Sequence, residues 1–169
     1  MTMKTKLMNA YMATARIFAE LSHARRLHVG AIVVKDDRII SIGYNGMPAG
    51  WDNNCEDQIW DTGAGGWLDP EEFNARYPYE GWHEVAQRNV RYGLKTKPEV
   101  LHAERNALDK LARGSESGQG ADMFVTHAPC LECAKSIYGA GIRTIYYAED
   151  YRSDDGIDFL RKCGVEVQK

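Results

Sequence analysis

The sequence predicts an α/β protein in which a mixed five-stranded sheet lies between helices, a three-layer α/β/α arrangement. Two observations lead to this prediction. Residues 29–34 and 39–44 are two apolar runs joined by the charged turn 35–38, so they predict a pair of antiparallel strands. From residue 101 onward, helical and strand patterns alternate, as they do in the βαβ units of a sheet with helices on both faces.

Each element of this arrangement follows from its own pattern. Leu7, Tyr11, Ala15 and Phe18 recur at helical spacing, which predicts an amphipathic helix over residues 7–21. After the second strand, Asn45-Gly46 is a turn dipeptide. Three further helices are expected at residues 101–112, 130–140 and 156–163, and three further strands at residues 123–126, 142–147 and 165–167.

The periodicity fades between about residues 47 and 98. We expect one domain over residues 1–169, with this stretch as an aromatic-rich insertion that contains short helices near residues 70–73 and 83–92. Two roles remain open: an ordered lid over a site, or a surface insertion packed for stability alone. The aromatic side chains that favour a lid are Trp51, Trp60, Trp67, Trp82, Tyr77 and Tyr79.

The composition is that of one soluble domain in a reducing compartment. The chain has 169 residues, a formal net charge of −3 and four cysteines without the spacing of a disulfide framework. We expect a cytoplasmic protein, because residues 1–26 lack a secretory apolar core and no stretch is apolar enough to span a membrane. The acidic balance argues against binding a nucleic-acid polymer.

Two short motifs carry the chemistry. The first is His102-Ala103-Glu104, and the second runs from Pro129 to Cys133 with cysteines at both 130 and 133. One imidazole and two thiolates make three zinc ligands, which leave a fourth tetrahedral position for a water molecule, as in catalytic zinc sites. Glu104 is then a spare carboxylate that can move protons. Other interpretations are a structural zinc knot, with Cys55, Cys163, His83 or His127 as fourth ligand, or a redox cysteine pair.

The spacing of these motifs places both at helix starts. His102 and Glu104 are roughly 200° apart around an ideal helix, so they can converge only where side chains project beyond its first turn. Cys130 and Cys133 are three residues apart and share one helical face, with Pro129 expected at the first position of that helix. The positive end of the helix dipole favours the thiolate forms of the cysteines.

The two motifs are similar to the H-x-E and P-C-x-x-C signature of zinc-dependent nucleobase deaminases. The resemblance extends further, to the deoxycytidylate (dCMP) deaminases, and covers roughly residues 7–50 and 101–167. It implies the cytidine-deaminase-like fold. The stretches that carry it are residues 22–31, 38–46, 102–107, 129–135, 140–142 and 150–151, among which the turn Gly43-Tyr44-Asn45-Gly46 discriminates best.

The resemblance implies that a zinc-activated water hydrolyses dCMP at C4, which gives dUMP and ammonia. Glu104 takes a proton from that water, passes it to ring N3 and assists departure of the amine. The Ala103 N–H is expected to hold the base carbonyl, and Asn45 the sugar or the base. Arg26, Tyr151 and, less strongly, Ser22 are expected at the 5′-phosphate, although Arg26 also fits a solvated surface arginine.

The same resemblance implies a homohexamer regulated by nucleotides, activated by dCTP and inhibited by dTTP with Mg²⁺. Tyr44, Gly46 and Arg113 are then expected near the second nucleotide site or a subunit contact. Some relatives carry a second, structural zinc. The comparable early ligand position here is Ala24, beside His23, and only Cys55 and His83 remain as donors for a rebuilt site.

Alternative functions stay open. A deaminase acting on dCTP or another cytosine nucleotide fits the same arginine equally well. Deaminases of free cytidine or of a tRNA adenosine fit less well, because Arg26 and Tyr151 suggest a phosphate contact and the chain lacks a basic stripe. A non-catalytic zinc domain that binds nucleotides is the remote alternative, and such a domain has no use for Glu104.

Overall fold

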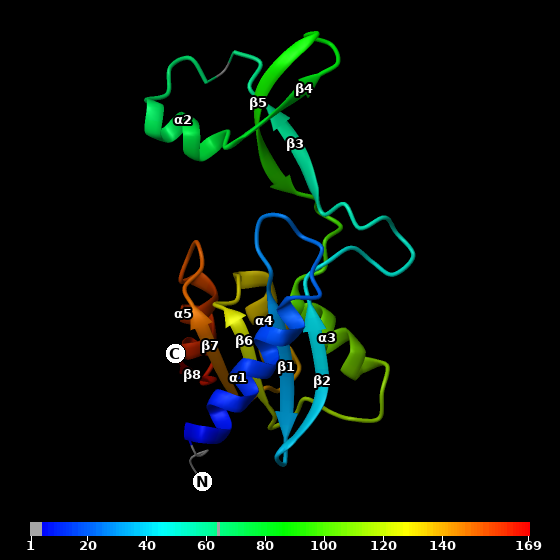
Figure 1. The fold of residues 1–169 in the computed structure, drawn as a ribbon. Helices are drawn as coiled ribbons and strands as arrows, with labels where there is room; N and C mark the ends of the chain where they lie inside the picture. The colour runs from blue at the N-terminus through cyan, green and yellow to red at the C-terminus, as the bar shows by residue number, and fades with distance from the viewer. Residues whose placement is uncertain (1–4, 64) are drawn as a thin grey trace.

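The computed structural model describes residues 5–63 and 65–169, and the expected domain also includes residues 1–4 and 64, which lie outside this part of the chain. The elements form a core and a projecting part (Figure 1). In chain order they are α1 (Thr5–Ala19), β1 (Gly30–Lys35), β2 (Arg38–Tyr44), β3 (Glu56–Trp60), α2 (Pro70–Arg76), β4 (Tyr79–His83), β5 (Arg88–Thr96), α3 (Ala103–Ala112), β6 (Asp122–His127), α4 (Leu131–Gly139), β7 (Thr144–Glu149), α5 (Asp155–Lys162) and β8 (Glu166–Gln168).

The core sheet has five strands in the order β2-β1-β6-β7-β8, which confirms the predicted mixed sheet. Strand β1 is antiparallel to both of its neighbours, β2 and β6, whereas β6, β7 and β8 are mutually parallel. The end of β2, the start of β1 and the ends of β6 and β7 therefore lie at one edge of the sheet. Segments that are far apart in the sequence, residues 24–29, 45–46, 127–130 and 150–152, meet at that edge.

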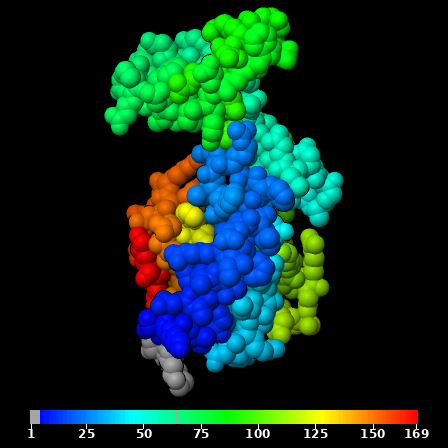
Figure 2. Space-filling model, viewed as in Figure 1, coloured from blue at the N-terminus to red at the C-terminus, as the bar shows by residue number. Residues whose placement is uncertain are grey.

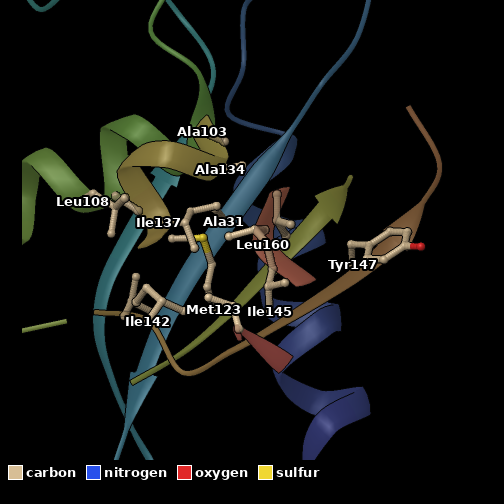
Figure 3. Close-up of a cluster of buried hydrophobic side chains, with 14 of the residues drawn as sticks. Ala31, Ala103, Leu108, Met123, Ala134, Ile137, Ile142, Ile145, Tyr147 and Leu160 are labelled. Atoms are coloured by element: carbon tan, nitrogen blue, oxygen red, sulfur yellow. The ribbon is translucent and has the colours of Figure 1, made fainter. Parts of the chain in front are cut away.

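Helices cover both faces of the sheet, as predicted. On one face α1 alone packs Tyr11 and Ala15 against Ile32, Val34 and Phe124 of the strands. On the other face α3, α4 and α5 cover a larger cluster (Figure 3). Fully buried side chains such as Ile32 and Phe124 each stabilise the fold by about 1.5–3 kcal/mol relative to exposed ones.

The inserted segment forms a small structure of its own, which we call the arm (residues 56–96). Strands β3, β5 and β4 make a second, antiparallel sheet in that order, and α2 lies beside it as predicted, capped by Asp69. The predicted helix near residues 83–92 is wrong. This segment is the turn and second strand of a hairpin, because Val90 and Tyr92 alternate with polar residues and bury one face of β5.

The arm projects from the core as a separate lobe (Figures 1 and 2). Its aromatic side chains pack mainly against one another: the Trp60 ring lies 4.8 Å from that of Tyr92 and 5.0 Å from that of His83. Trp67 and Trp82 are 76% and 53% exposed. Of the aromatic residues that favour a lid, Trp67 and Trp82 are therefore on the outside of the arm, whereas Tyr79 contacts Arg25 of the core at the base of the arm.

Candidate functional site

Two helix starts face each other at the sheet edge. His102 is the N-cap of α3 and Cys130 is the N-cap of α4, so both side chains project beyond the first turns. Cys133 lies one turn into α4, on the same side as Cys130. Helix α4 begins at Leu131, so Pro129 precedes the cap and does not occupy the first helical position as predicted.

The three side chains form a group of the size that a metal ion requires. The His102 Nδ1 atom is 3.6 Å from Cys130 Sγ and 3.3 Å from Cys133 Sγ, and all three donor atoms lie within 4.8 Å of one another. Tetrahedral zinc, with bonds of about 2.3 Å to sulfur and 2.0 Å to nitrogen, separates such donors by roughly 3.6 Å. In residues 5–63 and 65–169 this is the only group of three or more potential ligands.

The charges around the donors favour a cation. Hydrogen bonds from Cys133 and His102 lower the pKa of the Cys130 thiol to about 3. The same interaction with Cys130, together with burial, raises the pKa of Cys133. Without a cation, one sulfur is therefore a thiolate and the other keeps its proton. The hydrogen bond to Cys130 also raises the pKa of His102. A divalent cation is the partner that stabilises both sulfurs as thiolates.

Glu104 is the buried carboxyl of the site. It is 4% exposed and lies in the first turn of α3, two residues after His102. Burial raises the pKa of this carboxyl to about 7, against the opposing effects of its own backbone N–H and of His102. Such a group exchanges protons readily near neutral pH, as a general acid–base residue must.

A cavity of about 220 Å³ opens beside this group. Of the residues predicted to form the site, Arg26, Asn45 and Tyr151 line it together with the whole His102–Glu104 tripeptide and Cys130. Cys133 is buried and is not a lining residue, but it belongs to the group of metal donors. Ser22 is not a lining residue; its buried hydroxyl instead accepts a hydrogen bond from the Ala24 N–H.

Asn45 has a more structural position than predicted. Its Oδ1 accepts a hydrogen bond from the Val29 N–H and its Nδ2 donates to the Leu27 carbonyl, both at 2.8 Å. The amide thus ties the end of β2 to the segment before β1, which is the segment that carries Arg26. One lone pair and one N–H of this amide remain for a ligand.

The residues expected at an allosteric site lie outside the cavity. The Tyr44 ring lies under the Lys110 ammonium at 5.6 Å, and Gly46 pairs through its backbone with Leu101. Arg113 is the exposed C-cap of α3, at the opposite end of that helix from His102.

The donors considered for a second zinc do not come together. Cys55 is buried against Ala24 and Val100 in a small apolar cluster at the base of the arm. His83 lies at the outer end of β4, opposite Arg88, and His23 is exposed. Among the described residues, Cys55, His83 and His23 therefore form no group of metal donors.

Three polar lining residues were missed from the sequence, namely Glu56, Thr96 and Arg152, and a fourth, His127, was considered only as a ligand of a structural zinc. Arg152 follows Tyr151 and its guanidinium lies over that ring at 5.5 Å, so a cation beside a predicted phosphate contact could have been noticed. His127 ends β6 and its Nδ1 is hydrogen-bonded to Thr126. Glu56 and Thr96 belong to the arm, and no local pattern assigns them to the site.

Fold and site together define a zinc-dependent deaminase. The chain matches the model for the cytidine and deoxycytidylate deaminase zinc-binding region over residues 5–149, and it belongs to this family. It is 36% identical over 155 residues to the deoxycytidylate deaminase of Enterobacteria phage T4, which covers 82% of this chain and 77% of the relative. It is also 34% identical over 160 residues to ComE operon protein 2 of Bacillus subtilis, over 94% of this chain and 68% of the relative.

A solved structure is similar to this chain in both sequence and fold. The dCMP deaminase from the cyanophage S-TIM5, in complex with dCMP and dUMP, is 39% identical and superposes with a TM-score of 0.75. That comparison covers 99% of this chain and all of the cyanophage chain. The arm is thus included in a likeness that extends over the whole length of both proteins.

Proposed function

We propose that the protein is a hydrolase that converts dCMP and water to dUMP and ammonia. The observation that carries the proposal is the grouping of His102, Cys130 and Cys133 beside the buried carboxyl of Glu104, in a cavity that also contains Arg26. The relatives named deoxycytidylate deaminase, and the cyanophage structure that holds dCMP and dUMP, support the choice of substrate.

His102, Cys130 and Cys133 would hold a zinc ion, which when bound would supply an acidified water molecule at neutral pH. Glu104 accepts a proton from the attacking water and delivers it to ring N3; it then carries the proton of the new C4 hydroxyl to the 4-amino group, and the C4–N bond breaks to release ammonia. The Ala103 N–H lies at the first turn of α3 on the cavity wall, where it can hold the base carbonyl. Burial of Glu104 excludes bulk water from this proton transfer.

At the other side of the cavity, Arg26 and Tyr151 contact the 5′-phosphate, and Asn45 contacts the nucleoside through its remaining hydrogen-bonding capacity. Arg152 adds a second cation at the same place. Two arginines favour a nucleotide over a nucleoside. They do not by themselves distinguish a monophosphate from a triphosphate, so dCTP or another cytosine nucleotide is the alternative substrate.

The test is to measure ammonia release from dCMP, dCTP and deoxycytidine side by side, with zinc-loaded protein. We expect the highest kcat/KM for dCMP and the lowest for the nucleoside. Preference for dCTP would favour the alternative substrate. Zinc-loaded protein that binds nucleotides and releases no ammonia from any of them would be a non-catalytic binding domain.

We also propose regulation by dCTP as activator and dTTP as inhibitor, with Mg²⁺, in a hexamer in the cytoplasm. Lys110, which lies over the Tyr44 ring, is one turn before Arg113 on α3, and Gly46 follows Tyr44 by two residues; we propose these residues for the effector site or for a subunit contact. Within the part of the chain that the structure describes, no helix is long and apolar enough to cross a membrane. Titration of the purified protein with dTTP during turnover tests the regulation, and a flat response would remove it; light scattering gives the subunit number.

A further inference from the structure

Glu56 is a buried carboxyl at the cavity that the proposed reaction does not use. It is the first residue of β3, at the base of the arm, and is 4% exposed. Its side chain lines the same cavity as Arg26, Asn45 and Glu104. It is neither a ligand in the metal group nor one of the residues that the sequence assigned to the site.

One oxygen of Glu56 is fully engaged. Its Oε1 atom accepts the backbone N–H of Arg25 at 3.0 Å and that of Arg26 at 3.2 Å. These two bonds join the arm to the segment before β1. Because they hold the backbone of Arg26, they help to direct its guanidinium to the cavity.

The other oxygen, Oε2, is buried and has no hydrogen-bond partner among the described residues. The neighbouring cations do not satisfy it. The Arg25 guanidinium donates to the Tyr92 hydroxyl and lies over the Tyr79 ring, and the Arg26 guanidinium donates to Thr96 Oγ1 at 3.3 Å. An unpartnered carboxylate oxygen in a protein interior is costly, so an unpartnered oxygen on a side chain that lines the cavity points to a hydrogen-bond donor on the ligand.

The chemistry of the substrate identifies that donor. The 5′-phosphate carries mostly two negative charges at pH 7, so it is mainly a hydrogen-bond acceptor and is repelled by a carboxylate. The amino group of the base has to lie near Glu104 and the metal donors, away from the arm. The remaining hydrogen-bond donor of dCMP is the 3′-hydroxyl of the deoxyribose. The deoxyribose lies between the base and the phosphate.

We propose that Glu56 is a positioning and specificity residue: Oε1 holds the Arg25–Arg26 backbone, and Oε2 accepts a hydrogen bond from the sugar 3′-hydroxyl. The inference rests on the proposed function, since it assumes that dCMP occupies the cavity. The base of the arm then recognises the sugar, whereas the outer part of the arm lies away from the substrate.

The test compares dCMP with 2′,3′-dideoxycytidine monophosphate, which lacks only the 3′-hydroxyl. For the unchanged protein we expect kcat/KM to be ~10- to 100-fold higher for dCMP, as for a hydrogen bond to a charged group. In Glu56→Ala this ratio should fall to about 1, because the acceptor is gone. Glu56→Gln keeps the Oε1 acceptor and exchanges the charged oxygen for a neutral amide, so the ratio should fall several-fold.

The glutamine variant keeps the test valid if the alanine variant does not fold. Glu80→Gln, an exposed glutamate on β4, is the matched control and should keep the ratio of the unchanged protein. A purely structural Glu56 would lower the rates for both substrates equally, and an unchanged ratio in Glu56→Gln would overturn the proposal. Equal kcat/KM values of the unchanged protein for dCMP and for the dideoxy analogue would also overturn the proposal. Absence of dCMP turnover in the unchanged protein would instead contradict the proposed function.

Discussion

Gly43 of β2 touches the backbone of α3 beside Ala103, the residue between the two functional side chains of the first motif. A Cβ built on Gly43 would lie 2.1 Å from the Ala103 carbonyl oxygen and 2.6 Å from the Ala107 nitrogen. The helix that carries His102 and Glu104 is therefore in direct backbone contact with the sheet. This contact fixes the helix start at the sheet edge.

The first prediction follows from this contact. Gly43→Ala forces α3 away from β2, and we expect a loss of about 1–3 kcal/mol in the free energy of unfolding together with reduced turnover. Gly139→Ala is the control, since a Cβ there meets no atom within 4 Å. Urea unfolding of both variants measures the difference; equal stability of the two would show that the helix can shift at little cost.

The second prediction concerns the proton transfer. Glu104→Gln removes the acid–base group but preserves the shape of the side chain, so we expect kcat to fall by ~10²- to 10⁴-fold or more while zinc remains bound. The measurement pairs steady-state kinetics with metal analysis of the same sample. Normal turnover by the glutamine variant would exclude Glu104 as the proton carrier.

The third prediction concerns the metal. Cys130→Ala should bind zinc much more weakly and lose turnover, and a chelator should have the same effect on the unchanged protein. Cys163→Ala, which changes a thiol near the chain end outside the metal group, should retain zinc and activity. Metal analysis after dialysis distinguishes the two variants. Retention of zinc by Cys130→Ala would mean that other residues hold the ion.

The fourth prediction uses two adjacent arginines. Arg26 lines the cavity, whereas the Arg25 side chain contacts Tyr92 and Tyr79 of the arm. Arg26→Ala should raise KM for dCMP by ~10- to 100-fold and have little effect on deoxycytidine, because only the nucleotide has a phosphate. Arg25→Ala should change KM for dCMP by less than about threefold. Equal losses on nucleotide and nucleoside would assign Arg26 a structural role.

The core and the metal group could be predicted because their signals are local. Apolar periodicity marks the helices and strands, and the residue types of His102-Ala103-Glu104 and of the cysteine pair indicate the metal chemistry wherever the chain folds. The structure brings these motifs together, as the shared sheet edge requires.

The remaining features depend on contacts between distant residues. Glu56 reaches the cavity only because the arm pairs with the segment before β1, thirty residues away in the sequence. Asn45 lines the cavity as expected, but its hydrogen bonds to the backbone of Leu27 and Val29 could not be predicted from local sequence. The sequence of residues 83–92 predicts a helix, whereas the segment forms part of a hairpin, because its short alternation becomes distinctive only when a partner strand is present.

The arm is stabilised by contacts among its own aromatic side chains, such as Trp60 and Tyr92. It contacts the core through a few residues at its base, among them Glu56 and Thr96. Substitutions or changes in length beyond that base can accumulate without displacing the groups that perform the chemistry. Natural variation should therefore be concentrated in the distal hairpin and α2, and an altered tip is the simplest way for this scaffold to acquire a new binding property while its turnover is preserved.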